Sequence, residues 1–387
     1  MTYDICIAAG PYNKQGGIER YNVELVRALK KEGHRVHLIV TQVDYDTSNI
    51  DEVIPLRTNI PFHPLAALVN AARVSRLRAD FKKRFPKGIF IVSGLPSWSA
   101  DIVIMHSVHL RSVRATNARE PRTAKGFVRR FLRLVYPANA IAILNEWFLV
   151  TRGAQLLIAI SEKAKKETIA TYGIDERKIA VVYEGVNPAD FHPDVEARRR
   201  LRKESGFSDD GFMFLFSGHE FKRKGLRYAV LALGKLHDDD VRLVVAGRDK
   251  SEAIRQMAED LRLTGRVIFI GSRNDFSDWC AAADAFLFPT LEDAFGLVIV
   301  EAMAAGLPVI TSGPAYAGAA ERLKDGFNAI LLDDPTDVEK MAAAMSRLVK
   351  DERLRASLGA NARKAALDFS WDRTARGIVG AWESHVK

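Results

Sequence analysis

The chain has 387 residues, of which 48% are hydrophobic and 27% are charged. A single hydrophobic core rarely grows beyond about 250 to 300 residues, so this length predicts two domains, and the near-average composition argues against a disordered, collagen-like or membrane-embedded chain. The 57 basic and 48 acidic residues leave a net charge of +9. That excess favours an anionic partner, and nucleic acid, an anionic membrane or a phosphorylated substrate would each satisfy it.

The cysteines and the N-terminal segment indicate the compartment. Cys6 and Cys280 are too few for a disulfide framework or a cysteine zinc site, as expected in a reducing cytoplasm. Asp4 and the lack of a basic leader predict that the first apolar run is a strand rather than a signal peptide. A proline and several polar residues interrupt the longest apolar region, residues 134–150, so it is not expected to span a bilayer.

The first half of the chain alternates strand patterns with amphipathic helical patterns. A strand is predicted at residues 3–9, and a helix at residues 18–31 follows it, with an apolar face made of Ile18, Tyr21, Leu25 and Leu29. Gly33 is expected to end this helix, and a strand at residues 35–41 completes a βαβ unit. The pattern extends into a parallel sheet through further predicted strands at residues 89–93, 102–105, 156–160 and 179–183.

A linker is predicted at residues 184–193, EGVNPADFHP, because turn-forming residues dominate there and no periodicity is present. A second α/β series follows, with strands at residues 212–217, 241–246, 267–270, 285–289 and 308–312. The two series share no sequence period, which argues against a repeat protein. Doubly wound sheets bind ligands at the carboxyl ends of their strands, so functional residues are expected at those positions.

Two motifs of the first domain occupy such positions. Gly16 and Gly17 stand at the start of the first helix, where paired glycines permit positive φ and a close approach of ligand to backbone, although a simple tight turn would use the same residues. The strand at residues 102–105 delivers His106 to the ligand edge, with His109 three residues later. A lone histidine is more often structural, so this motif alone leaves both roles open.

In the second domain, residues 216–233 predict a strand end, a basic loop and a helix. Lys222, Arg223 and Lys224 precede Gly225 and place cations at the ligand edge. A solvated basic turn is the alternative interpretation, and it is preferred for Lys222 and left open for Arg223.

The most informative stretch is residues 286–310, FLFPTLEDAFGLVIVEAMAAGLPVI. A buried strand is predicted to end at Pro289, and a helix is predicted to run from near residue 295 to Gly306. The first turn of a helix has unpaired N–H groups and partial positive charge, which suit a diphosphate. The candidate residues of this turn are Phe295, Gly296 and Leu297.

Two carboxylates flank that turn. Glu301 lies five residues beyond Gly296, roughly 7 to 8 Å along the helix, which matches the step from a β-phosphate to a ribose. Its oxygens can accept hydrogen bonds from both ribose hydroxyls, and Asp293 on the preceding loop can reach the sugar. The alternative is an acid that complements the helix dipole together with a surface glutamate.

Residues 293–301, DAFGLVIVE, resemble the signature of the family 4 retaining glycosyltransferases, in which an acid and a glutamate flank seven residues and G-x-P-V follows. The family normally has glutamate at the first position, where this chain has Asp293 with Glu292 beside it. The resemblance extends over nearly the full length of the chain. Within the family, the chain is similar to the lipopolysaccharide core glucosyltransferases. It implies an α/β GT-B fold, with two Rossmann-like doubly wound domains that face each other across a deep cleft.

The resemblance also implies a division of labour between the domains. Residues 1–185 would form the acceptor-side domain, and residues 186–369 would form the nucleotide-sugar-binding domain. A final helix at residues 370–387 would pack back on the first domain.

Individual roles follow from the same resemblance. Lys224 would bind the donor diphosphate, and Arg223 would replace a family arginine because its usual position holds His219. Glu301 would bind the ribose. Gly16 and Gly17 would face the donor phosphates and the acceptor, while His106 and Asp293 would act near the transferred sugar.

The implied reaction is retaining transfer of a hexose from a nucleoside diphosphate sugar to a glycan or lipid-linked acceptor. UDP-glucose or a related UDP-hexose is the expected donor, with GDP-mannose as the next choice. The donor is a co-substrate, and no cofactor or metal is expected because a lysine and a helix N-terminus neutralise the leaving group.

Three other functions were considered. A metal-dependent GT-A enzyme would use an aspartate pair such as Asp44 and Asp46 or the run at residues 238–240, both of which are better explained as polar turns. A nucleotide-sugar 2-epimerase shares the GT-B architecture. A nucleic-acid-binding protein would explain the net charge, but no binding motif occurs and the acidic pair would be unexplained, so no nucleic acid partner is expected.

Two basic segments of the first domain suggest an anionic membrane surface. Residues 73–85 and 111–135 combine cations with apolar residues at helical spacing, as in helices that lie on membranes. The alternative is that their apolar faces pack on the sheet. We therefore expect a cytoplasmic enzyme that binds peripherally at the inner face of the plasma membrane.

Overall fold

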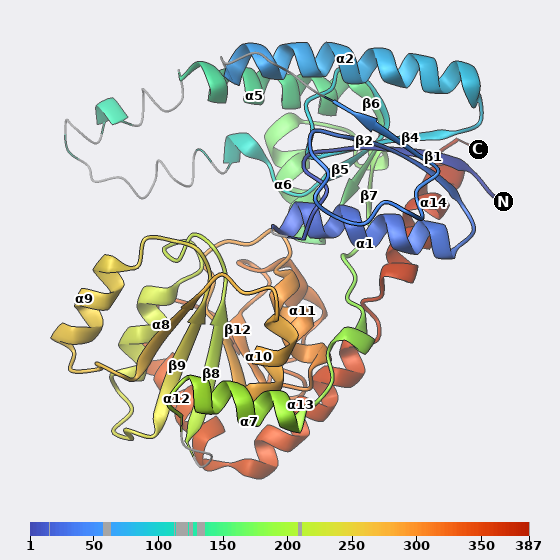
Figure 1. The fold of residues 1–387 in the computed structure, drawn as a ribbon. Helices are drawn as coiled ribbons and strands as arrows, with labels where there is room; N and C mark the ends of the chain where they lie inside the picture. Colours follow the sequence, from blue (N-terminus) through green and yellow to red (C-terminus); the bar gives the residue numbers. More distant parts are fainter. Residues whose placement is uncertain are drawn as a thin grey trace. The chain divides into compact units, whose positions relative to one another are not determined.

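The computed structural model describes residues 1–14, 16–56, 63–111, 113, 123, 127–129, 136–207 and 211–386. The chain forms two compact units (Figure 1). The N-terminal unit comprises Met1–Tyr183 and Trp371–Lys387, and the C-terminal unit comprises Glu184–Ser370. The predicted domain limits differ from these bounds by no more than two residues.

The N-terminal unit is built on the strands β1 (Asp4–Ala9), β2 (Arg35–Val40), β3 (Glu52–Pro55), β4 (Ile89–Ser93), β5 (Ala100–Met105), β6 (Ala154–Ala159) and β7 (Ile179–Val181). They form one parallel sheet in the order β3-β2-β1-β4-β5-β6-β7. β4 and β5 are buried along their whole length, as expected for strands whose two faces are both covered. The strand order reverses between β1 and β4, so the ligand edge of this unit is centred there.

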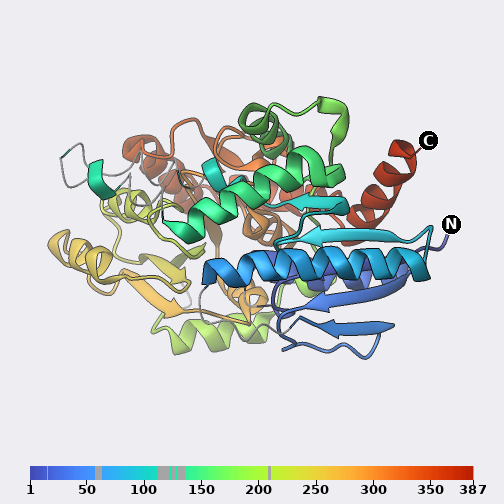
Figure 2. The same ribbon diagram turned by 90° about the horizontal axis from the view of Figure 1, so that it is seen from above.

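Helices cover both faces of this sheet. The described α-helices are α1 (Gly17–Lys31), α2 (His63–Arg84), α5 (Pro137–Phe148), α6 (Glu162–Tyr172) and α14 (Trp371–His385). Figure 1 shows α2 and α5 over one face and α1 and α14 over the other, and α2 and α5 lie side by side in Figure 2 as well. Gly33 ends α1 with φ 85°, as predicted. On the predicted apolar face of α1, Ile18 is instead 38% exposed, because it lies in the first turn at the end of the sheet.

The C-terminal unit repeats this architecture with six strands: β8 (Phe212–Ser217), β9 (Val241–Ala246), β10 (Val267–Gly271), β11 (Ala285–Phe288), β12 (Val309–Ser312) and β13 (Ile330–Leu332). They are parallel, in the order β10-β9-β8-β11-β12-β13, and the order reverses between β8 and β11. The helices are α7 (Val195–Glu204), α8 (Leu226–Leu233), α9 (Glu252–Asp260), α10 (Phe276–Ala282), α11 (Leu297–Ala304), α12 (Val338–Lys350) and α13 (Glu352–Ala366).

Every strand predicted from the sequence is present, with ends within two residues of the prediction. β3 and β13 were not predicted, because they are only four and three residues long. Cys6 and Cys280 are both buried and unpaired. None of the helices in the described part of the chain combines the length and the hydropathy that a bilayer crossing requires.

Candidate functional site

The strands at the reversal of the C-terminal sheet, β8 and β11, each end in a loop that carries predicted site residues. The first loop leads through Lys224 into α8, and the second leads through Asp293 into α11. Hydrogen bonds join the loops: Leu291 N donates to the carbonyl of Arg223 at 2.9 Å, and Arg223 Nη1 donates to the carbonyl of Glu292 at 2.9 Å. The predicted basic and acidic motifs therefore form one site.

Lys224 and Asp293 form an ion pair in this site, with the lysine Nζ donating to Oδ2 of the aspartate. Their side chains are 9% and 17% exposed. Nζ also lies 5.3 Å from the centroid of the Phe288 ring. Burial lowers the pKa of Lys224, and the negative charge of Asp293 opposes that shift. The sequence assigned both residues to the donor but did not predict that they pair with each other.

A glycine fixes where the basic loop ends. Gly225 has φ 75°, and a Cβ at this position would lie 1.9 Å from the carbonyl oxygen of Pro289. No side chain fits there, so the start of α8 packs directly on the end of β11. This close approach holds Lys224 beside the acidic loop.

The acidic loop leads into α11, whose N-cap is Gly296 with φ 97°. The helix begins at Leu297, two residues later than predicted, because the left-handed backbone of Gly296 precedes it. Phe295 is only 1% exposed and its ring packs on Phe369 with centroids 5.9 Å apart, so its side chain belongs to the core. The backbone at the helix start, rather than this ring, is the part that suits a phosphate.

Glu301 lies on α11 and is 2% exposed. The alternative of a surface glutamate is therefore wrong. A carboxylate so deeply buried is expected to be fully hydrogen-bonded or to serve a ligand.

The other two basic residues of the loop differ from Lys224. The guanidinium of Arg223 forms an ion pair with Glu220 at 2.6 Å and also donates a hydrogen bond to the acidic loop. Much of its positive charge is therefore already paired within the protein. Lys222 is exposed, in agreement with a solvated turn. His219 accepts a hydrogen bond from the backbone N of Arg248 at 3.0 Å and thereby ties the loops after β8 and β9 together.

In the N-terminal unit, Gly16 and Gly17 stand at the start of α1 as predicted, but the reason for glycine differs from the prediction. Neither adopts positive φ, and Gly16 is extended with φ −128°. A Cβ at Gly16 would lie 2.2 Å from Oε2 of Glu19, whereas nothing crowds Gly17. Glycine at position 16 thus makes room for a carboxylate.

His106 follows directly after β5 and is half-buried. Its Nε2 lies 2.9 Å from Oγ of Ser93, the last residue of β4. Its ring packs edge-on against Tyr21 of α1, with centroids 4.7 Å apart, and Tyr21 packs edge-on against Trp371 of α14. Contacts from β4 and α1 therefore hold the imidazole at the ligand edge of the N-terminal sheet, and α14 supports Tyr21.

The backbone at His109 is held by α5 and α6. Its N donates to both carboxylate oxygens of Glu146, at 3.2 and 3.1 Å, and the hydroxyl of Tyr172 donates to Oε1 at 2.7 Å. Burial raises the pKa of Glu146. This network fixes the segment that follows His106.

The aspartate runs considered for a metal act as turn residues. Asp46 accepts hydrogen bonds from the backbone N and Oγ of Ser48, at 2.9 and 3.0 Å, and Asp238 accepts one from the backbone N of Asp240 at 3.1 Å. Within the described ranges, no group of three or more histidine, cysteine, aspartate or glutamate side chains is arranged to hold a metal ion.

Sequence reasoning missed the hydroxyl residues that support these loops. Thr311 Oγ1 donates to the carbonyl of Phe288 at 3.0 Å, and Ser312 Oγ donates to the carbonyl of Thr290 at 2.7 Å. Ser93 plays the corresponding part beside His106. The available signal was the same in each case: a hydroxyl residue at the end of an otherwise apolar strand.

Both units match known protein families. The model "Glycosyltransferase Family 4" matches residues 15–190, and the model "Glycosyl transferases group 1" matches residues 197–365. Three relatives illustrate the sequence similarity. A glycosyltransferase of Methanocaldococcus jannaschii is 26% identical over 95% of this chain and 94% of its own. A D-inositol 3-phosphate glycosyltransferase of Xylanimonas cellulosilytica is 29% identical over 96% and 92%. The lipopolysaccharide glucosyltransferase WaaG of Escherichia coli is 28% identical over 54% and 57%.

Solved structures show the same fold. The crystal structure of WaaG, a glycosyltransferase involved in lipopolysaccharide biosynthesis, aligns with a TM-score of 0.74 at 22% identity, covering 97% of this chain and 98% of its own. Anabaena HepE in complex with UDP and glucose aligns with a TM-score of 0.75 at 18% identity, covering 99% and 100%. At such identities the likeness shows the architecture alone, and it confirms the predicted pair of Rossmann-like domains.

Proposed function

Because this chain is a family 4 glycosyltransferase with the GT-B fold, we propose that it transfers a hexose from a nucleoside diphosphate sugar to a glycan or lipid-linked acceptor with retention of configuration. One observation carries the donor half of this proposal. The buried pair of Lys224 and Asp293 adjoins the start of α11, and Glu301 lies farther along the same helix. A cation, a helix N-terminus and a buried carboxylate are the groups that a nucleoside diphosphate sugar requires.

The donor would engage these groups in a definite order along α11. The diphosphate binds at the helix start, where it draws Lys224 Nζ away from Asp293. Glu301 accepts hydrogen bonds from the ribose, since five residues of helix span roughly 7 to 8 Å. The released carboxylate of Asp293 accepts a hydrogen bond from the sugar. Binding thus exchanges one ion pair for another, and a hydrogen bond from the sugar takes the place of the lysine at Asp293.

Catalysis would depend on positioning and charge stabilisation. His106 lies near the transferred sugar, where it hydrogen-bonds a hydroxyl or stabilises the positive charge of the transition state. The acceptor attacks from the face that the leaving group vacates, and the departing phosphate oxygen helps to accept its proton. Lys224 and the start of α11 stabilise the leaving group without a metal ion.

The donor and the pathway are proposed from the named relatives. We expect UDP-glucose or a related UDP-hexose, since HepE was crystallised with UDP and glucose, and GDP-mannose is the second choice. The similarity to WaaG supports an acceptor in lipopolysaccharide or another cell-envelope glycan. A thermal-shift panel of nucleotide sugars tests the donor, because a ligand that binds only the folded state raises the melting temperature.

A product assay tests the reaction class. A transferase releases nucleoside diphosphate when the sugar moves to an acceptor or to water, whereas an epimerase interconverts free nucleotide sugars without an acceptor. Interconversion alone would contradict the proposal. The alternative of a nucleic-acid-binding protein is not favoured, because the matched families are glycosyltransferases.

We also propose membrane association, but on residues outside the two basic segments that suggested it from the sequence. In α2, which contains all but the last residue of the basic segment 73–85, Val74 and Phe81 are buried, and Arg78 and Lys82 pair with the buried carboxylate of Asp101. The apolar face of this segment therefore packs on the protein, as the alternative interpretation stated. Most of the segment 111–135 lies outside the described residues.

The neighbouring helix α5 carries the exposed side chains on which we propose membrane association. Leu144, Trp147 and Phe148 are 65%, 41% and 37% exposed, and the Arg152 guanidinium lies 5.4 Å from the centroid of the Trp147 ring. Exposed aromatic and basic side chains favour the membrane interface. We expect the protein to sediment with anionic liposomes at low salt and to be released by salt. Failure to bind at low salt, with efficient transfer to a small soluble acceptor, would contradict this part of the proposal.

A further inference from the structure

A cavity of about 430 Å³ lies in the N-terminal unit, at the carboxyl ends of β1 and β2. Its volume falls within the range of ordinary small-molecule sites. The lining residues come from the loop after β1, the first turn of α1 and the loop after β2: Pro11, Asn13, Gly16, Glu19, Gln42 and Asp44. All of these lining residues belong to the N-terminal unit, whereas Lys224, Asp293 and Glu301 belong to the C-terminal unit.

The two loops around the cavity are held in place by backbone pairing. Tyr12 N donates to the carbonyl of Gln42 at 2.9 Å, and Asp44 N donates to the carbonyl of Tyr12 at 3.0 Å. Tyr12 is 1% exposed and anchors this pairing in the core. The absence of a Cβ at Gly16 leaves room for the Glu19 carboxylate beside it. The paired loop backbones thus form the cavity wall before a ligand arrives.

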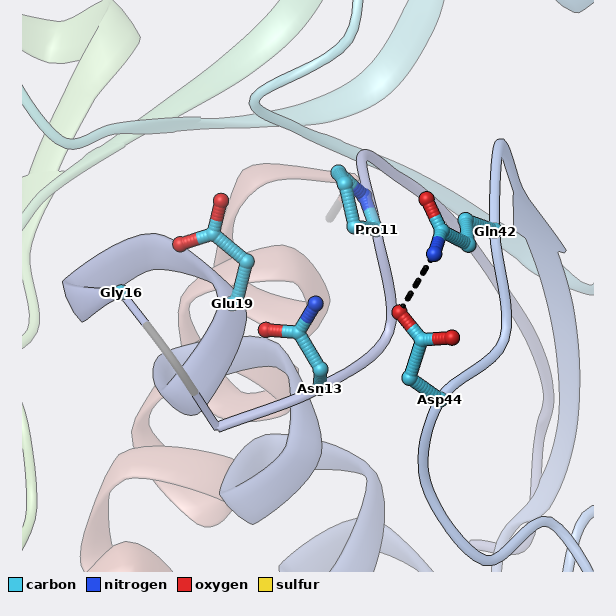
Figure 3. Close-up of a pocket in the computed structure, with 6 residues that line it drawn as sticks. All are labelled: Pro11, Asn13, Gly16, Glu19, Gln42 and Asp44. Atoms are coloured by element: carbon cyan, nitrogen blue, oxygen red, sulfur yellow. Dashed lines mark hydrogen bonds between the residues drawn. The ribbon is translucent and has the colours of Figure 1, made fainter. Parts of the chain in front are cut away.

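The lining carries two carboxylates and no cation among its described residues. Figure 3 shows Glu19 and Asn13 on one side of the cavity and Gln42 and Asp44 on the other. Gln42 Nε2 donates to Asp44 Oδ2 at 2.7 Å, which uses one of the few lining donors within the cavity wall. Carboxylates accept hydrogen bonds and donate none, so a partner rich in hydroxyl donors matches this lining.

Nearby cations do not offset these carboxylates. Lys14 Nζ binds Oε1 of Glu24 at 2.6 Å and lies 5.2 Å from the centroid of the Tyr45 ring. Arg27 binds the same Glu24 at 3.3 Å and also stacks on Tyr45. Neither Lys14 nor Arg27 lines the cavity. A phosphate there would therefore meet two carboxylates and no cation among the described lining residues.

We propose that Glu19 and Asp44 determine acceptor specificity by holding an uncharged, hydroxyl-rich ring in this cavity and repelling a phosphorylated one. The inference rests on the proposed function, because it assigns part of the acceptor of that reaction. Any phosphate of a lipid-linked acceptor then lies outside the cavity. This preference for an uncharged ring would distinguish the chain from its relatives that are named D-inositol 3-phosphate glycosyltransferases.

The experiment compares matched neutral and phosphorylated probes on the full-length protein. Ligand-observed NMR measures the affinities of inositol, D-inositol 3-phosphate, methyl α-glucoside and glucose 6-phosphate. Each neutral probe should bind at least about tenfold more tightly than its phosphorylated counterpart at low salt, and the ratio should shrink as salt screens the repulsion. The double variant E19Q/D44N keeps the side-chain shapes and removes both charges, so the ratio should fall to about twofold.

Asp46→Asn is the matched control, because it removes a carboxylate from the same loop at a residue that does not line the cavity. It should keep the wild-type ratio. Equal or tighter binding of the phosphorylated probes to the wild type, or an unchanged ratio in E19Q/D44N, would overturn the inference. The thermal shift produced by UDP-glucose reports the donor site separately, so failure of that shift would count against the proposed function instead.

Discussion

The ion pair between Lys224 and Asp293 leads to a counterintuitive prediction for Asp293→Asn. If the donor diphosphate must draw the lysine away from the aspartate, removing the aspartate charge should strengthen binding of a diphosphate that carries no sugar. UDP is the suitable probe, because it lacks the hexose that Asp293 is expected to contact. The same change should weaken catalysis with UDP-glucose.

The magnitude follows from the burial of the pair. Exposed ion pairs contribute about 0.2 to 1 kcal/mol, and buried ones cost roughly 3 to 5 kcal/mol to break. Side chains that are 9% and 17% exposed lie between these limits, and some of the cost is regained when the phosphate replaces the aspartate. A net gain of about 1 to 2 kcal/mol corresponds to roughly 5- to 30-fold tighter UDP binding. Isothermal titration calorimetry measures this difference directly.

Stability should change in the opposite direction. In Asp293→Asn the nearly buried ammonium of Lys224 loses its counter-charge, so the melting temperature of the free protein should fall. Its pKa should also fall below the already lowered wild-type value, because burial remains and the opposing charge is gone. Only the protonated lysine attracts a diphosphate, so UDP binding should weaken at a lower alkaline pH in the variant than in the wild type.

Glu292→Gln is the matched control, because it removes the same charge from the neighbouring residue of the same loop. Its UDP affinity should stay within about twofold of the wild-type value, since a charge that does not contact the lysine is largely screened. Unchanged or weaker UDP binding in Asp293→Asn would refute the exchange of ion pairs.

Three further outcomes follow from the structure. Lys224→Ala and Glu301→Ala should each lower transfer on the order of 100- to 1000-fold in a protein that still folds, and wild-type turnover in either would remove that residue from the site. Transfer should survive EDTA, because the protein supplies the positive charge at the leaving group; a strict requirement for magnesium or manganese would contradict this. Gly225→Ala should lower the free energy of unfolding by roughly 2 to 5 kcal/mol, because its Cβ would overlap the Pro289 carbonyl at positive φ. Gly173→Ala, at φ 64° with nothing within 4 Å, should lose only about 1 to 2 kcal/mol, and equal losses in a thermal or denaturant melt would show that the contact is unimportant.

The parts of this structure that were predicted correctly have a local cause. Apolar runs of five or six residues give the long strands, and Gly33 ends α1 because its missing Cβ permits the required backbone. The motif residues were located by their position after strands, which the topology then brought to one edge of each sheet. Ile18 shows the limit of this reasoning. Helical spacing predicts which residues share a face of the helix, but it does not predict whether the sheet covers each of them.

The errors and omissions in the site all depend on contacts between distant segments. The pairing of Lys224 with Asp293 joins residues 69 positions apart, and nothing in either loop alone specifies it. The ring of Phe295 packs on Phe369, and a Cβ at position 16 would meet the side chain of Glu19 rather than require a positive φ. Such relations arise only when the packing of whole elements is known.

The return of α14 to the N-terminal unit affects the order in which the protein can be made. Residues 184–370 are continuous, so every residue of the C-terminal unit is synthesised before α14. The N-terminal unit has its whole sheet much earlier, but Tyr21 still lacks Trp371, 5.3 Å away in the finished protein. The first unit to begin synthesis therefore receives its last helix only after the second unit has been synthesised.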